Sequence, residues 1–318
     1  YGRGATAGEA GTTVPTACAA CGGCVAWQSH GSTSDDEWGF SRQGHDAMGM
    51  LQVNNTQFVD CFAESNGGGL SIHGMKRGTR DVNGVTLNDV SFTRCAVSNG
   101  GPSAQGEKIY AVGGALALWN LHYAEAAIYM RRVAFTNNTV YSRCTDIGSC
   151  SASDPADYPA PAAGGGAMWA FSQGPSDPVP SPCNEGICGH LKIYMWDSTF
   201  TGNKVTSFAR KGFTAGGGVL LWEDDIQASI YNTHFDENSV NAFGGVYEGG
   251  GGGLFRKESR VLPGRAGHVY LQDKTVFTSN RVNIAATDWA HWRTINRFTR
   301  AEGLGHSFKT EGGDNDDM

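Results

Sequence analysis

The chain has 318 residues, of which 46 are glycine, and its 24 basic and 31 acidic side chains give a formal net charge of −7. Glycine is about twice as frequent as in an average protein, which indicates many turns. The hydrophobic content of 40% is enough for a packed core and excludes a mostly disordered chain. The negative charge without a long basic run argues against nucleic acid as a partner, and no stretch approaches the ~18 apolar residues of a transmembrane segment.

Several features point to export from the cell. The chain begins at Tyr1 without a methionine, so we expect a processed chain or a piece of a larger protein. It contains nine cysteines and two glycosylation sequons, which begin at Asn54 and Asn137. Cytosolic thiols are kept reduced and glycans are added only to exported chains, so we predict an extracellular or cell-surface glycoprotein with disulfides.

Six segments share one spacing pattern. Each has a phenylalanine, and the position three residues later is either cysteine or asparagine. The phenylalanines are Phe58, Phe92, Phe135, Phe200, Phe235 and Phe277, and the later positions are Cys61, Cys95, Asn138, Asn203, Asn238 and Asn280. Apolar or small residues recur seven, five and two positions before the phenylalanine, as at Ile128, Met130 and Val133. These offsets alternate with period two on each side of a break, so they predict two short strands joined by a turn.

A further strand, led by a glycine pair, follows most copies. Examples begin at Gly68, Gly113, Gly165, Gly217 and Gly252. The cluster from Cys21 to Trp27 looks like an earlier copy whose companion strands have diverged. The last copy is shifted by one residue, with Val269 and Leu271 at the apolar positions.

This repeat predicts the fold class. Three short strands with loops fit each interval between phenylalanines, which is typical of one coil of a parallel β-helix. Stacked asparagine side chains at a corner can hydrogen-bond one another and the turn backbone. We therefore predict an all-β chain that forms a right-handed parallel β-helix of about six to seven coils. A propeller would need a regular series of hairpin turns, and an α/β solenoid would need helical periodicity between the strands.

The repeat also divides the chain. Residues 1–49 are an N-terminal segment with a divergent first coil, residues 50–286 hold the coils, and residues 287–318 form a C-terminal cap or contact segment with an acidic tail. Two proline-rich insertions, at 143–163 and 172–190, interrupt the coils. Loops of this length in a compact unit are usually functional.

The pattern Phe-Thr-x-Asn-x-Val followed by Gly-Gly-Ala resembles a known repeat. Its best copy is Phe135–Val140 with Gly165–Met168. It is similar to the repeat of the chlamydial polymorphic outer-membrane proteins and related β-helix surface proteins, over about Met50 to Val282. The resemblance implies a passenger-type surface or adhesive rod and supplies no catalytic site. Cysteines in the first two asparagine positions depart from the pattern.

The cysteine positions predict disulfides. Cys61 and Cys95 occupy the same column of successive coils, where the ~4.8 Å strand spacing falls within the usual Cα separation of a disulfide. Two further pairs are close in sequence, namely Cys144 with Cys150 and Cys183 with Cys188. Cys21 and Cys24 are also predicted to form disulfides, and the pairing among Cys18, Cys21 and Cys24 stays open. Metal binding is the alternative for the loop pairs, but no histidine pair accompanies them, so we predict disulfides and neither a metal nor a cofactor.

Two features raise the possibility of chemistry or ligand binding. The carboxylates Glu223, Asp224 and Asp225 directly follow a predicted strand, and β-helix polysaccharide lyases and hydrolases line a groove with such residues. Consecutive carboxylates at a corner point in different directions, however, which favours a solvated corner. Trp119, Trp169 and Trp222 lie on the same strand of successive coils and would form either a sugar-stacking platform or part of the core.

The leading prediction is a non-enzymatic structural or adhesive β-helix module of a cell surface or fibre. Its expected partners are copies of itself or other chains of an extracellular assembly, with glycans as further candidates. The ends of a β-helix expose unpaired strand edges, and one of nine cysteines must remain unpaired, so we expect contacts between copies through the termini or loops. The alternative is a carbohydrate-active β-helix enzyme that uses Glu223, Asp224 or Asp225.

Overall fold

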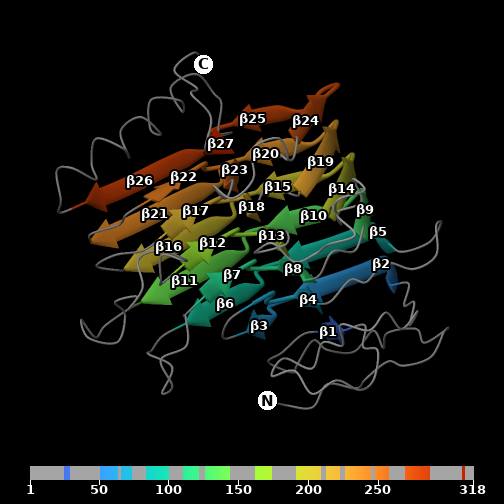
Figure 1. Ribbon diagram of the computed structural model, residues 1–318, viewed down its shortest axis with the longest axis horizontal. Helices are drawn as coiled ribbons and strands as arrows, with labels where there is room; N and C mark the ends of the chain where they lie inside the picture. The colour runs from blue at the N-terminus through green and yellow to red at the C-terminus, as the bar shows by residue number, and fades with distance from the viewer. Residues whose placement is uncertain are drawn as a thin grey trace, which may run out of the picture.

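A computed structural model shows an all-β architecture of stacked parallel strands (Figure 1). It describes residues 25–28, 51–63, 66–73, 84–99, 110–121, 126–143, 162–173, 191–208, 213–222, 226–244, 248–257, 269–286 and 310–311. These residues form strands and turns and contain no helix. The chain visits the sheets in a repeating order, and each strand pairs in parallel with its counterpart from the neighbouring repeat.

The strands belong to four open sheets, which we label A to D. Sheet A contains β1 (Val25–Gln28), β4 (Leu70–His73), β8 (Leu116–Leu121), β13 (Met168–Gln173), β18 (Val219–Trp222), β23 (Leu254–Lys257) and β27 (Thr310–Glu311). Sheet B contains β2 (Leu51–Val59), β5 (Gly84–Thr93), β9 (Ala126–Arg131), β10 (Ala134–Thr136), β14 (Leu191–Trp196), β15 (Thr199–Thr201), β19 (Ile226–Tyr231), β20 (His234–Asp236), β24 (Val269–Gln272) and β25 (Val276–Thr278).

The remaining strands are shorter on average. Sheet C contains β3 (Phe62–Ala63), β6 (Ala96–Asn99), β11 (Thr139–Arg143), β16 (Lys204–Phe208), β21 (Ser239–Gly244) and β26 (Arg281–Ala286). Sheet D contains β7 (Tyr110–Val112), β12 (Ala162–Gly164), β17 (Phe213–Ala215) and β22 (Glu248–Gly250).

The core follows from period-two alternation along the strands. In β14, Leu191, Ile193 and Met195 are buried while the residues between them are half-buried. The inward residues of sheets A and B form the largest apolar cluster. A second cluster joins the other face of sheet A to sheet D, and a third joins sheets C and D. Burial of these faces is the main source of stability, because apolar surface removed from water stabilises by about 25 cal/mol per Å².

The predicted phenylalanine column is confirmed in register. Phe58, Phe92, Phe135, Phe200, Phe235 and Phe277 are paired in order along sheet B. Neighbouring rings stack with centroids 4.6, 5.0, 4.6, 4.7 and 4.6 Å apart. The one-residue shift of the last copy is also confirmed, since Val269 pairs with Ala228 while Phe277 still pairs with Phe235.

The glycine pairs make the turns between sheets D and A. Gly165 has a φ of 63°, a conformation that other residues adopt only with strain. A Cβ on the next residue, Gly166, would lie 2.1 Å from the carbonyl oxygen of Gly217 in the neighbouring repeat. Glycine therefore serves two purposes at this corner, because it allows both the turn and the close stacking of successive turns.

The structure differs from the sequence prediction at sheet D, at the two insertions and in the C-terminal segment, and it agrees with the prediction at the early copy. Sheet D is an additional sheet, whose strands lie directly before the glycine turns. Strands reach into both predicted insertions, because β12 begins at Ala162 and β13 ends at Gln173. The early copy predicted around Cys21 to Trp27 is represented by β1, whose Val25 pairs with Leu70. In the C-terminal segment, β27 pairs with β23 and so extends sheet A.

Candidate functional site

The most ordered polar feature is a ladder of buried asparagines where sheet B passes into sheet C. Asn138, Asn203 and Asn238 are fully buried, and Asn280 continues the row. The Nδ2 of each fully buried asparagine donates to the Oδ1 of the asparagine in the following repeat at 2.9 Å. Each Nδ2 also donates to the carbonyl oxygen of a phenylalanine in the preceding repeat, at 2.8 to 3.1 Å. Each Oδ1 further accepts the backbone N–H of the preceding ladder position. The predicted asparagine column is therefore confirmed as a hydrogen-bonded network.

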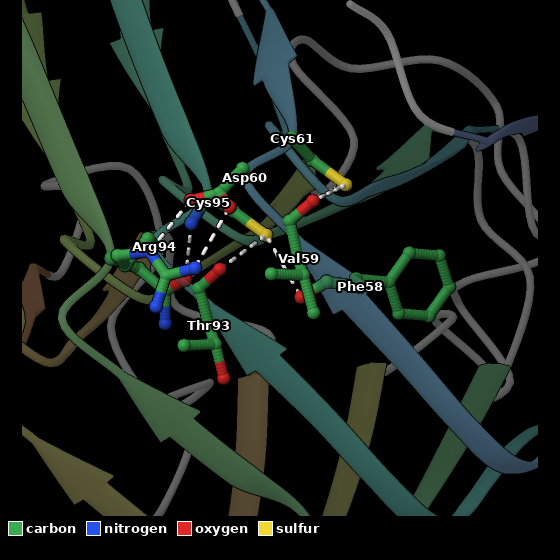
Figure 2. Close-up of polar contacts among 8 residues, drawn as sticks. Phe58, Val59, Asp60, Cys61, Thr93, Arg94 and Cys95 are labelled. Carbon is green, nitrogen blue, oxygen red and sulfur yellow. Dashed lines mark hydrogen bonds and ion pairs between the residues drawn. The ribbon is translucent and has the colours of Figure 1, made fainter. Parts of the chain in front are cut away.

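Cys95 occupies the ladder position in the repeat before Asn138 and makes some of the contacts that asparagine makes in the other repeats (Figure 2). Its backbone N–H donates to Asn138 Oδ1 at 2.9 Å. Its thiol Sγ lies 3.6 Å from the carbonyl oxygen of Phe58, which is the contact that Nδ2 makes elsewhere in the ladder. Burial raises the pKa of the Cys95 thiol to about 11, so the neutral thiol is the form that this corner accommodates.

The predicted Cys61–Cys95 disulfide is wrong. Cys95 is a free, buried thiol, whereas Cys61 is disulfide-bonded, so the partner of Cys61 is another cysteine. The two cysteines do share a column, because Val59 pairs with Thr93 and Phe62 with Ala96 on either side of them. Their sulfurs point to different places, however: Figure 2 shows Cys95 Sγ directed toward the Phe58 carbonyl and Cys61 Sγ beside Val59. Because Cys95 is buried, this thiol is not available to crosslink copies.

The buried thiol gives the first prediction. At pH 8 a thiol with a pKa of about 11 is thiolate in roughly one molecule per thousand, and burial also blocks access. We expect iodoacetamide to leave Cys95 unmodified in the folded, non-reduced protein and to modify it after unfolding in urea. Peptide mapping by mass spectrometry checks both states. Because the folded-state pKa lies above the unfolded value, the Cys95 contribution to stability is complete below about pH 8.5 and declines as pH rises toward 11. Rapid labelling of Cys95 in the native protein would contradict this assignment.

Charged side chains line the exposed turns beside the ladder. Arg94 makes a two-point ion pair with Asp60, at 2.7 and 2.8 Å, and Arg132 makes one with Asp89, at 2.6 and 2.7 Å. The hydrogen bond from Arg94 is the main reason that the pKa of Asp60 lies below its usual range, and Arg132 lowers the pKa of Asp89 likewise. All four residues have positive φ, near 54°, in two turn columns. These exposed pairs join successive repeats but add little stability.

The side chains of the two sequon asparagines face solvent, as predicted. Asn54 and Asn137 are both exposed, whereas the neighbouring Asn138 is buried in the ladder. Asn54 Oδ1 accepts a hydrogen bond from Asn88 Nδ2 at 3.1 Å, which leaves the Asn54 Nδ2 atom to carry a glycan. Glycosylation itself stays a prediction. We expect protein from a eukaryotic secretory host to lose mass at both sites on treatment with an N-glycanase, and unmodified sequon peptides from such a host would contradict it.

Several predicted site residues lie outside the described residues. These are Glu223, Asp224 and Asp225, and the cysteines Cys21, Cys24, Cys144, Cys150, Cys183 and Cys188. Within the described ranges, no three histidine, cysteine, aspartate or glutamate side chains gather as a metal-ion site. The same ranges hold no apolar helix of the length that crossing a bilayer requires.

The tryptophan platform considered from the sequence is wrong for two of its members. Trp169 and Trp222 are each only 2% exposed and belong to the cluster between sheets A and D. The sequence did not single out another aromatic group, on the outer face of sheet B, where Tyr129, Tyr194 and Trp196 lie in contact. The available signal was that these residues alternate with the buried Ile128, Ile193 and Met195.

No protein-family model matches the chain, and no match is found among curated proteins or solved structures. The resemblance to the outer-membrane protein repeat therefore remains an expectation based on the sequence.

Proposed function

We propose that the chain is a non-enzymatic structural or adhesive module built as a right-handed parallel β-helix, and that it works at a cell surface or in an extracellular fibre. The observation that carries this proposal is the continuous ladder of Phe58 to Phe277 and Asn138 to Asn280, which stacks successive repeats in one register. Such in-register stacking gives a rod with regular side faces. The resemblance to surface-protein repeats and the exposed sequons agree with an extracellular site.

The proposal extends to association between copies through the last described repeat. In that repeat β24, β25 and β26 are edge strands, which have a pairing partner on one side within the described residues. Leu271 and Val276 are 41% and 38% exposed there, although Leu271 lies in the column that is buried in the preceding repeats. Exposed apolar edge strands favour pairing with another chain. Contacts of this end with a different surface of a second copy would build an open fibre.

The oligomeric state of the native, non-reduced protein tests this proposal. We expect light scattering and electron microscopy to show concentration-dependent oligomers or fibres, and Leu271→Lys to shift the distribution toward monomer by placing a charge on the apolar end. Gln272→Lys is the matched control, because Gln272 is an exposed, already polar neighbour on the same strand. A strictly monomeric wild-type particle at high concentration would overturn the association part of the proposal.

A further inference from the structure

The last described repeat of sheets B and C leaves one end of the stack open (Figure 1). β24, β25 and β26 pair with the preceding repeat, and no described strand pairs with their other edge. Val269, Leu271 and Phe277 continue columns whose preceding members are buried, yet Leu271 is 41% exposed and the other two are half-buried. We define the open end as Val269, Leu271, Phe277 and Asn280.

The asparagine ladder reaches the open end with two N–H groups unused. In the preceding repeats, the backbone N–H and one Nδ2 hydrogen of each asparagine donate to the Oδ1 of the following asparagine. Asn280 Oδ1 accepts from Asn238, and Asn280 Nδ2 donates to the Phe235 carbonyl oxygen. Within the described residues, neither the backbone N–H of Asn280 nor its second Nδ2 hydrogen has an acceptor.

The open end also presents one acceptor. In the preceding repeats, the phenylalanine carbonyl oxygen accepts a hydrogen bond from the Nδ2 of the following asparagine, as at Phe200 and Phe235. Phe277 lies in register with Phe235, and no ladder asparagine follows it among the described residues. Two donors and one acceptor therefore lie together beside the ring of Phe277.

An asparagine side chain matches all three groups. Its Oδ1 can accept both N–H groups of Asn280, and its Nδ2 can donate to the Phe277 carbonyl oxygen, whereas aspartate has no donor for that oxygen. In each ladder repeat the asparagine stands three residues after a phenylalanine whose ring stacks on the preceding one. The segment that fits is therefore an extended strand with the pattern Phe-x-x-Asn, and a strand added to a sheet edge also forms backbone hydrogen bonds.

Neither end of a second copy supplies this asparagine. The first repeat of sheet B is followed at the ladder position by Cys61, which is disulfide-bonded and has no amide group. The last repeat presents the same two Asn280 donors, and donors that face donors do not pair. A second copy can therefore cover the apolar part of the open end but leaves its ladder groups without partners.

We propose that the open end is a docking site for a strand of a partner protein that carries the pattern Phe-x-x-Asn. The phenylalanine of this strand stacks on Phe277, and its asparagine completes the ladder at Asn280. The inference deepens the adhesive part of the proposed function and rests on it, because it names the chemistry of the partner. Association between copies is a separate property, so binding is measured at a protein concentration at which light scattering shows a single species.

A peptide with the sequence of Ala126–Arg143 tests the site, because this segment carries the pattern in the chain's own third repeat. Its Ile128, Met130, Phe135 and Asn138 belong to the same columns as the four residues of the open end. We expect the labelled peptide to bind the full chain saturably in fluorescence anisotropy. Bound peptide should also slow hydrogen exchange across β24, β25 and β26.

Variants of the peptide test the recognition without changing the folding of the protein. Asn138→Ala should weaken binding by about tenfold or more, because three hydrogen bonds are lost. Asn138→Cys places the residue of the first repeat at this position and should weaken binding to a similar degree. Phe135→Ala removes the ring that stacks on Phe277 and should also cost about tenfold in affinity.

A protein variant locates the binding site. Leu271→Lys places a charge on the open end and should weaken peptide binding by about tenfold or more. Gln57→Lys is the matched control, because it adds the same charge at an exposed position in the first repeat of sheet B, and it should leave binding unchanged.

Equal binding of the Asn138→Ala or Asn138→Cys peptide, protection of other strands in place of β24 to β26, or no binding of the unmodified peptide would each overturn the inference. Oligomers of the wild-type protein without peptide binding would refute this docking site and leave association between copies standing. Peptide binding by a strictly monomeric protein would support the docking site and refute association between copies.

Discussion

Replacing Phe200 by alanine is expected to lower the free energy of unfolding by roughly 3–5 kcal/mol. Phe200 is fully buried at the centre of the phenylalanine stack, with Phe135 at 4.6 Å and Phe235 at 4.7 Å between ring centroids. The substitution removes about six carbon atoms of packing and two stacking contacts, and the flanking strands are hydrogen-bonded in register and cannot close the cavity.

Urea unfolding of the non-reduced protein, followed by circular dichroism, measures this change. Phe208→Ala is the matched control, because Phe208 also stacks on a phenylalanine in the next repeat, Phe243, but is 39% exposed. We expect a loss below about 1 kcal/mol for the control. Similar losses for Phe200 and Phe208 would mean that the stack is not the core of the fold.

This column also shows what the sequence could predict. A phenylalanine followed three residues later by asparagine fixes both side chains relative to one turn, so the sequence pattern predicted which residues of neighbouring repeats would pair. Sheet D was missed because its strands are only three residues long and no residue type is common to all four, as a comparison of Tyr110–Val112 with Glu248–Gly250 shows. Strands that short carry too little periodicity to be recognised.

Register predicts which Cα atoms are neighbours but not where side chains point. Cys61 and Cys95 are neighbours in the column, yet the Cys95 thiol points to the Phe58 carbonyl and stays free.

The aromatic group of Tyr129, Tyr194 and Trp196 on the outer face of sheet B was missed for a related reason. The sequence pattern was defined by the buried residues, such as Ile193 and Met195, and not by the outward Tyr194 between them. Tyr194 stacks on a residue of another repeat, and the sequence alone does not place those two side chains together.

Asn203→Ala is expected to lower the free energy of unfolding by roughly 3–4 kcal/mol, although it removes only a small polar side chain. Asn203 takes part in four side-chain hydrogen bonds: two accepted by Oδ1 from Asn138 and two donated by Nδ2, to Asn238 and to the Phe135 carbonyl. Alanine leaves the buried N–H of Asn138 without its ladder acceptor, far from water. An unsatisfied buried group costs about 1–3 kcal/mol, and the broken network accounts for the rest.

Two comparison variants separate hydrogen bonding from packing. Asn203→Asp keeps the size of the side chain but replaces the Nδ2 donor with an oxygen that would face the acceptors Asn238 Oδ1 and Phe135 O, so it should destabilise at least as much as alanine at pH 7. Asn241→Ala removes an asparagine whose Oδ1 also accepts a hydrogen bond from the following repeat, from Asn283 Nδ2, but at a solvent-accessible position, and should cost within about 0.5 kcal/mol. Equal stability of the Asn203 and Asn241 variants in urea would show that the buried ladder adds nothing beyond ordinary strand pairing. A large difference would identify the ladder as the polar counterpart of the phenylalanine stack, since the two columns lie three residues apart and fix the same register.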